Sequence, residues 1–248
     1  MPITVKTTTK NENSGETLAQ QARRLLAHAW GFRDCPSELL DELIAVSQFR
    51  RISKGEMVLR RNDPMSHVGM VVNGMADSST QHANGHRHLV GLLLPGDFYG
   101  FGSLIDPVMP RHAQDLSGRE DGNIMQIPLE AFRHLRAREP KLVMACEHQL
   151  ARRLHLLFER MAVDPAMPLP MRTAGMLHTM GQLYGHAEGE HIVIDVRLSQ
   201  TDMADWLGMS RQRVNFALKQ LERDGLISLH YSALTILQPK ALAELARG

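Results

Sequence analysis

The spacing of hydrophobic residues changes along the chain, and the first change predicts a sheet domain. Between residues 56 and 127, short apolar runs such as HVGMVV and HLVGLLL alternate with Asn-Gly, Pro-Gly-Asp and Asp-Gly steps. Short runs bounded by glycine and asparagine are typical of antiparallel strands. We therefore expect a β-roll, or jelly-roll, of about 80 residues. The pair Asn73-Gly74 suits a tight hairpin within it.

The segment before the roll predicts little regular structure. Residues 1–20 hold Lys and Glu among Thr and Asn and lack the apolar core of a signal peptide. We expect a mobile N-terminal extension over residues 1–34. A Ser N-cap followed by apolar residues at helical spacing then predicts a short helix over residues 37–49.

After Pro128 the pattern becomes helical, and residues 140–165 carry two adjacent apolar stripes. The first stripe, at steps of three or four, consists of Val143, Cys146, Leu150, Leu154, Leu157 and Met161. The second consists of Leu142, Ala145 and Leu156. A helix with two apolar flanks can pack on its own domain with one and on a second copy with the other. We favour a homodimer seam along the first stripe over a single-sided core helix.

A proline-rich hinge at residues 164–170 precedes the pattern of a winged helix-turn-helix. The segment TDMADWLG predicts a short helix that ends at Gly208, and Ser210 can cap a second helix just beyond the turn. Asp224-Gly225 ends that helix, and LISL with ALTILQ predicts a β-hairpin wing. The expected domains are the extension (1–34), the roll (35–138), the dimerisation helix (139–164) and the DNA-binding domain (165–248).

In a helix-turn-helix, the N-terminal turn of the second helix enters the DNA major groove. Arginine can bond guanine bidentately and glutamine can do the same with adenine, so Arg211 and Gln212 are the predicted base readers. Asn215 is expected on the same face, and Phe216 either contacts a thymine methyl group or packs. The expected phosphate contacts, which fix register without reading sequence, are Ser199, Thr201, Ser210, Arg213 and Lys219.

Composition narrows the possible functions. The formal net charge is +1, so any binding to nucleic acid must come from a local arrangement of Lys and Arg. Cys35 and Cys146 are the only cysteines, too few for a disulfide scaffold or a four-cysteine metal site within one chain. No apolar run is long enough to span a membrane. We expect a cytoplasmic protein without a membrane partner and, for lack of a nucleophile or acid–base motif, without enzyme activity.

The segments ISKGEMVLRRNDPMSHVGMVVNG, LLLPGDFYGFGSLI and LSQTDMADWLGMSRQRVNFALKQLERDGLI together resemble the Crp–Fnr superfamily of bacterial transcription regulators. The resemblance covers nearly the whole chain from about residue 35. It implies an α+β protein with an N-terminal cyclic-nucleotide-binding-type β-roll, a long dimerisation helix and a C-terminal winged helix-turn-helix. It also implies a homodimer on a palindromic operator in double-stranded DNA, with RNA polymerase as a partner if the protein is an activator.

The resemblance also places a candidate effector pocket. Nucleotide-binding members carry a Glu for the ribose directly after the second glycine of a segment like GDFYGFGSLI, and an Arg followed by a small hydroxyl residue for the cyclic phosphate. Here Arg111 keeps the arginine, but Phe101 replaces the Glu and His112 the hydroxyl residue. Leu157 and Phe158 stand where polar residues meet the adenine. The candidate pocket thus comprises Gly100, Phe101, Gly102, Arg111, His112, Leu157 and Phe158.

Unpaired polar groups of a nucleotide in such an apolar pocket would cost about 1–3 kcal/mol each. Cyclic AMP is therefore a possible but disfavoured effector, and the cofactor remains unknown. Sensing of gas by haem and redox sensing occur on the same scaffold and stay open as alternatives, although nothing in the sequence fixes a haem ligand.

Two further features bear on specificity and on metals. In the second helix of the helix-turn-helix, Gln212 replaces a Glu and Phe216 an Arg found in many relatives, which predicts a related but different half-site. Histidines gather at His82, His86 and His88, and at His186 and His191 with Glu188 and Glu190. We interpret both groups as solvated turns rather than as metal sites.

Overall fold

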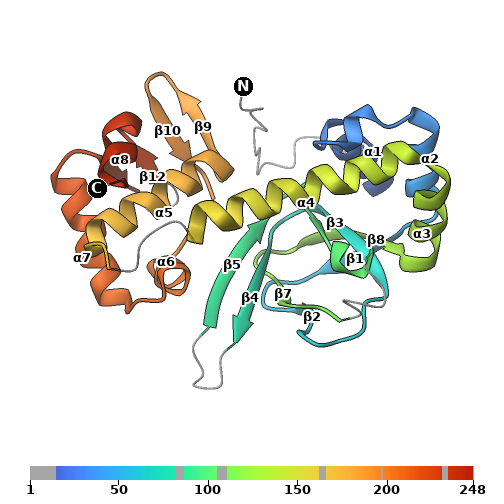
Figure 1. Ribbon diagram of the computed structural model, residues 1–248, viewed down its shortest axis with the longest axis horizontal. Coiled ribbons are helices and arrows are strands. Elements are labelled where there is room, and N and C mark those ends of the chain that lie inside the picture. Colours follow the sequence, from blue (N-terminus) through green and yellow to red (C-terminus); the bar gives the residue numbers. More distant parts are fainter. Residues whose placement is uncertain are drawn as a thin grey trace. The chain divides into compact units, whose positions relative to one another are not determined.

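The computed structural model describes residues 15–81, 87–104, 111–161, 166–196, 198–230 and 234–247 (Figure 1). The chain divides into two compact units between Arg153 and Leu154, within helix α4 (Pro140–Met161). The first is called the roll unit and the second the C-terminal unit. No helix in the described ranges is long and apolar enough to cross a membrane.

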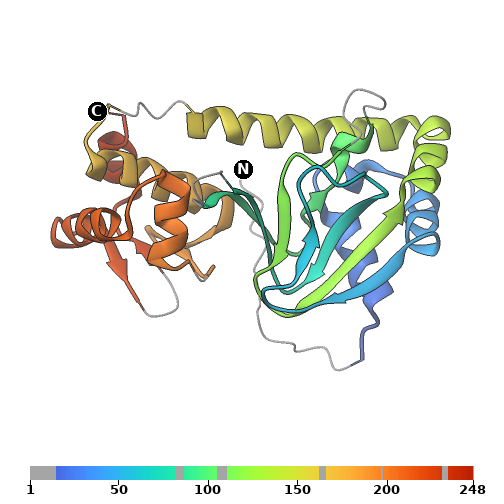
Figure 2. The ribbon, with the colours of Figure 1, turned by 90° about the horizontal axis from the view of Figure 1, so that it is seen from below.

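The roll unit is built on two four-stranded antiparallel sheets. One sheet has the order β1 (Gln48–Ile52), β8 (Gly122–Pro128), β3 (His67–Asn73) and β6 (Phe98–Tyr99). The other has the order β2 (Met57–Leu59), β7 (Asp115–Gly118), β4 (Ala76–Gln81) and β5 (Arg87–Leu93). Figure 2 shows the strands wrapped into a roll. The expectation of a β-roll is confirmed.

The predicted hairpin at Asn73-Gly74 is wrong. Strand β3 pairs with β6 and β8, whereas β4 pairs with β5 and β7, so the turn carries the chain from one sheet to the other. Gly74 has a φ of +73°, and a Cβ there would lie 2.5 Å from the carbonyl oxygen of Asp121. The turn thus needs glycine for its backbone conformation and for close packing, whichever strands it joins.

Apolar side chains from both sheets fill the interior of the roll. They are Ile52, Val58, Val71, Ala76, Leu93, Tyr99, Leu116 and Ile124. Tyr99 lies against Gly69 of the neighbouring strand, where a Cβ would come within 2.0 Å of the ring atom Cζ. The missing side chain at Gly69 therefore makes the room that the Tyr99 ring occupies.

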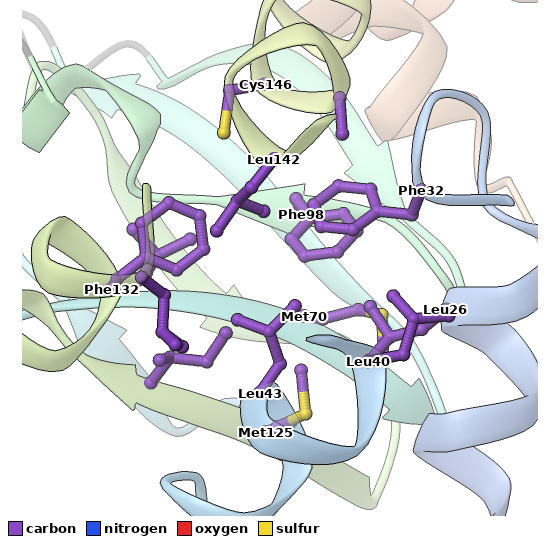
Figure 3. Packing of buried hydrophobic residues seen from close by; sticks show 14 of the residues in the cluster. Leu26, Phe32, Leu40, Leu43, Met70, Phe98, Met125, Phe132, Leu142 and Cys146 are labelled. Atoms are coloured by element: carbon purple, nitrogen blue, oxygen red, sulfur yellow. The ribbon is translucent and has the colours of Figure 1, made fainter. Parts of the chain in front are cut away.

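Helices cover the outer face of the sheet that contains β3 and β8. They are α1 (Leu18–His28), the 3-10 helix η1 (Phe32–Asp34), α2 (Ser37–Ala45), α3 (Leu129–Arg138) and the beginning of α4. Figure 3 shows the ring of Phe32 stacked on that of Phe98, with Leu142 and Cys146 reaching the same cluster from α4. The centroids of the two rings are 4.4 Å apart. This outer cluster is the larger core of the roll unit.

The expected mobile extension over residues 1–34 is wrong for residues 18–34. Helix α1 begins with a capping box between Thr17 and Gln20, and its residues Ala22 and Leu26 are fully buried in the outer cluster. Residues 1–14 lie outside the described ranges. The helix expected over residues 37–49 ends at Ala45, because the chain enters strand β1 at Gln48.

The assignment of Cys146 to the dimer seam is also wrong. Its side chain is 2% exposed and packs in the outer cluster together with Leu142 and Ala145. The close approach of Gly31, where a Cβ would lie 2.9 Å from Cα of Ala145, fixes this face of α4 against the N-terminal segment. Cys146 therefore belongs to the face of α4 that packs within its own unit.

Beyond the end of α4, the described part of the C-terminal unit combines four helices with a small antiparallel sheet. The helices are α5 (Leu169–Tyr184), α6 (Gln200–Leu207), α7 (Arg211–Arg223) and α8 (Pro239–Leu245). The sheet has the order β11 (Ile227–Leu229), β12 (Leu234–Ile236), β10 (His191–Ile194) and β9 (Gly185–Glu188). Strand β9 occupies most of the polar loop expected at 186–190, whereas β11 and β12 form the expected wing hairpin. The winged helix-turn-helix is confirmed.

The contact between Gly69 and Tyr99 generates a stability prediction. Gly69→Ala should lower the free energy of unfolding by about 1–3 kcal/mol, because the methyl group overlaps the Tyr99 ring. The same substitution in a Tyr99→Leu background should cost less than half as much. Urea titration of the four proteins of this cycle measures the coupling. Gly15→Ala, with open space around its Cβ, is the control. An equal cost with and without the ring would contradict the explanation.

Candidate DNA-binding and effector sites

The first helix of the helix-turn-helix is fixed at both ends. The Ser199 hydroxyl accepts the N–H of Asp202 at 3.1 Å, and the Asp202 carboxylate accepts the N–H of Ser199 at 2.8 Å. At the other end, Gly208 adopts a φ of +65° and ends α6. Arg172 of α5 donates to the carbonyl of Leu207 at 3.0 Å, which ties the turn to the body of the unit. Gly208 thus ends the helix as expected.

The second helix, α7, is held by one apolar face. Val214, Ala217, Leu218 and Leu221 are all buried. The Ser210 hydroxyl accepts the N–H of Arg213 at 3.5 Å and caps the helix, as the sequence predicts. Burial of a leucine or valine side chain contributes about 1.5–3 kcal/mol, so this face is strong enough to fix the exposed side of the helix in space.

The exposed side of α7 carries the predicted DNA contacts. Arg211, Gln212, Arg213, Phe216 and Lys219 are all exposed, as are Thr201 and Ser210. Two arginines in the first turn, where α7 has no acidic residue, oppose the positive end of the helix dipole. An anion such as a DNA phosphate would offset that repulsion. Contact of these residues with DNA stays a prediction.

Two of the predicted contacts have partners inside the unit. The Ser199 hydroxyl is engaged in the cap of α6, and the half-buried Asn215 accepts a hydrogen bond from Gln200 Nε2 at 2.8 Å. Asn215 therefore connects α6 to α7 in addition to lying near the reading face. Arg223, which was not among the predicted contacts, lies one helical turn beyond Lys219, and its Nε donates to the Lys219 carbonyl at 3.3 Å. Its spacing of seven residues from Phe216 was the available signal.

The candidate effector pocket of the roll is not assembled as expected. Gly100 has a φ of +86° and leads into the 3-10 helix η2 (Phe101–Leu104). Phe101 is 3% exposed and packs in the outer cluster, with its ring centroid 5.4 Å from that of Phe98. The predicted place of Phe101 in a pocket inside the roll is therefore wrong. A Cβ on Gly102 would lie 2.9 Å from Cε of Met65.

The other residues of the candidate pocket lie in different surroundings. Arg111 is exposed and its Nη1 donates to the carbonyl of Asn62 at 2.6 Å. His112 is buried, and this burial lowers its pKa. Residues 105–110, between them and η2, lie outside the described ranges. Leu157 and Phe158 are exposed residues of α4 in the C-terminal unit.

A partly buried polar cluster inside the roll was not predicted. His67 meets Tyr99 edge to face, with ring centroids 5.8 Å apart, and its Nε2 lies 2.6 Å from Gln126 Nε2. Because a carboxamide nitrogen only donates, His67 accepts this bond with Nε2. Burial, together with the charges of His112 and Arg50, lowers the pKa of His67 to about 4. The available signal was position, since His67, Gly69 and Val71 share one face of β3.

Neither thiol has the properties of a redox-reactive cysteine. Burial raises the pKa of Cys146 to about 12 and also raises the pKa of Cys35. The Cys35 thiol donates to the carbonyl of Lys141 at 3.6 Å. A raised pKa favours the protonated thiol over the thiolate. Because the thiolate is the reactive form, both cysteines are held in the unreactive form.

The histidine groups named from the sequence form no metal cluster in the ranges that the structure covers. No set of three or more His, Cys, Asp or Glu residues converges there. His186 lies 3.5 Å from both Glu188 and Asp195, whereas His191 Nδ1 lies 2.9 Å from the carbonyl oxygen of Leu237. His82 and His86 are outside the described residues.

Comparison with known proteins agrees with both halves of the fold. Residues 49–139 match the family model of the cyclic nucleotide-binding domain, and residues 171–245 match that of the Crp-like helix-turn-helix domain. This order of domains defines a class of DNA-binding transcription regulators with a sensor roll. The chain is a member of the Crp–Fnr superfamily within that class.

Individual relatives are distant but cover most of the chain. The transcriptional regulatory protein btr of Bordetella pertussis is 23% identical over 84% of this chain and 84% of its own length. The CRP-like cAMP-activated global transcriptional regulator of Mycobacterium tuberculosis is 26% identical over 90% of this chain and 99% of its own. The solved structure of FixK2 from Bradyrhizobium japonicum matches with a TM-score of 0.70 at 20% identity, covering 81% of this chain and 97% of that one.

The low pKa of His67 generates a prediction about pH. The unfolded chain binds a proton near pH 6.5, but folded His67 does so only near pH 4, so the stability of the roll should fall as the pH drops from 6.5 to 4. When it unfolds between pH 6.5 and 4, the His67→Gln protein should take up as much as one proton fewer than the wild type does. Urea titrations at several pH values measure the slope, with the exposed His28→Gln as control. Equal slopes in the wild type and His67→Gln would contradict the assignment.

Proposed function

We propose that the protein is a homodimeric regulator that binds a palindromic operator through α7 of each protomer. The observation that supports this best is the arrangement of α7, in which four buried apolar residues hold an exposed face rich in arginine. Arg211 and Gln212 read base edges. Arg213, Lys219, Thr201 and Ser210 contact phosphates and set the register of the helix in the groove. The site of action is bacterial DNA in the cytoplasm.

The dimer is proposed to form along the apolar residues of α4 that do not pack in the roll unit. These residues are Met144, Leu150, Leu154, Leu157 and Phe158, and Val143 is partly exposed beside them. Leu154 and Phe158 are 51% and 58% exposed in the single chain. Large apolar side chains recurring at three- and four-residue steps on an exposed helix face are typical of a helix-pair interface. The side chain of Met161 lies outside the described ones.

We propose that the effector is not conventionally bound cyclic AMP, although one relative carries that nucleotide in its name. The residues present do not fit the nucleotide. Phe101 is buried in the outer cluster where a ribose-binding carboxylate would be expected from the family, and His112 is buried and resists protonation. The effector instead acts on the roll by shifting the population of α4 packings, and RNA polymerase is a further partner if the output is activation.

The reading role of α7 generates the first functional prediction. Arg211→Ala combined with Gln212→Ala should weaken binding to the selected operator by roughly a hundredfold or more, because each bidentate base contact contributes about 1–3 kcal/mol. The operator is first selected from random duplexes with the wild-type protein, and binding is then measured at fixed salt. Arg247→Ala, an exposed arginine outside α7, should bind as the wild type does. Unchanged binding by the double variant would mean that α7 does not read DNA.

The proposed dimer seam along α4 generates the second functional prediction. Leu154→Asp should raise the dimer Kd by roughly a thousandfold, since two leucine contacts worth about 2 kcal/mol each are lost. Sedimentation across a dilution series measures the Kd. Lys141→Asp, at an exposed position in the first turn of α4 and far along the helix from Leu154, is the matched control and should stay dimeric. A Leu154→Asp protein that remains a dimer at the dilution of the wild type would refute the seam.

A further inference from the structure

Phe216 is an apolar residue on the most exposed side of α7. Its side chain is 66% exposed, which is more than that of any other large hydrophobic residue described. An apolar side chain that is exposed to water does not stabilise the fold. The buried face of the helix lies elsewhere, at Val214, Ala217, Leu218 and Leu221. The ring is therefore not part of the core that holds α7 in place.

The spacing along α7 places Phe216 among polar reading residues. Gln212, Phe216, Lys219 and Arg223 follow one another at steps of three or four, on the side of the helix opposite the four buried residues. Side chains of a helix lean toward its N-terminus, so the Phe216 ring lies over the turn that contains Gln212. Four residues rise about 6 Å, which corresponds to about two base-pair steps. Phe216 and Gln212 therefore face base pairs within about two steps of one another.

The charges around the Phe216 ring indicate what kind of partner binds this face of α7. Lys219 and Arg223 share the exposed side with Phe216, and Arg211 and Arg213 flank it. The carboxylate of Glu222 is directed to the wing, where it accepts the N–H of Leu229 at 3.0 Å. A partner with an acidic surface and an apolar group at its centre fits this face. In the major groove, thymine is the base that offers such an apolar group, its C5 methyl.

We propose that Phe216 is a specificity-determining residue that contacts the C5 methyl group of a thymine within about two base pairs of the one read by Gln212. The proposal rests on the DNA-reading function of α7 proposed above. Burying one methyl group contributes about 0.8 kcal/mol, which is about fourfold in affinity per half-site. A symmetric loss in both half-sites therefore amounts to about 15-fold.

The experiment removes the methyl group and nothing else. Each thymine of the operator selected by the full-length protein is replaced in turn by deoxyuridine in both half-sites, and binding is measured at fixed salt. At one thymine position, the wild type should bind the uracil operator about 15-fold more weakly. Phe216→Ala should bind the thymine and uracil operators equally. Phe216→Leu, which keeps an apolar side chain, should retain part of the preference.

A matched control separates this contact from general DNA affinity. Lys219→Ala, on the same face of α7, should weaken binding to both operators while it keeps the thymine-to-uracil ratio of the wild type. The proposal is overturned if no thymine position distinguishes the two operators, or if Phe216→Ala keeps the preference. A wild type that selects no operator at all would instead overturn the proposed function. Circular dichroism verifies that each variant is folded.

Discussion

The packing of aromatic rings on the outer face of the sheet with β3 and β8 determines most of the roll unit. Phe98 stacks on Phe32 and contacts Phe101, which in turn lies near Phe132 of α3, with ring centroids 6.5 Å apart. Rings of this size bury about 150–250 Å² each, so their placement outweighs weaker local preferences. Once Phe98 faces the helices, the alternation of the strand turns Tyr99 into the roll.

That alternation has a direct consequence for ligand recognition. After Tyr99, the positive φ of Gly100 lets the chain turn so that Phe101 returns to the outer cluster. A position where relatives carry a carboxylate for a ribose is thereby used for core packing. Inside the roll, His67, Gln126 and the hydroxyl of Tyr99 lie instead near the space opened by Gly69, and the charge of Arg50 acts on both His67 and Tyr99.

Sequence patterns predicted elements well where one local signal was decisive. Gly208 and Ser210 mark the end of one helix and the start of the next because a left-handed residue and a capping hydroxyl act within a few residues. The errors arose where distant segments decide. Both flanks of α4 are apolar, so periodicity alone could not show that Cys146 packs on the roll. Asn73-Gly74 is a tight turn by composition, but strand pairing decides what it joins.

Side-chain partners were the least predictable feature of the candidate site. The carboxamide of Asn215 could read a base, yet its oxygen already accepts a hydrogen bond from Gln200 of the preceding helix. Only the folded arrangement of α6 and α7 reveals this bond. Helix α1, which was not predicted, is likewise stabilised by distant residues, since Ala22 and Leu26 pack in the outer cluster against the sheet.

The first half of α4 gives the roll a mechanical connection to the proposed seam. Gln149 donates to the carbonyl of Trp30 at 2.6 Å, and the Trp30 ring stacks on His148 at a centroid distance of 5.5 Å. Together with the buried Leu142, Ala145 and Cys146, these contacts fix the rotation of the helix about its axis up to residue 149. A helix resists twisting because each turn is hydrogen-bonded to the next. A repacking of the outer cluster that rotates this segment therefore rotates Leu150 in the same sense. The proposed signal depends on this coupling, whichever ligand the roll binds.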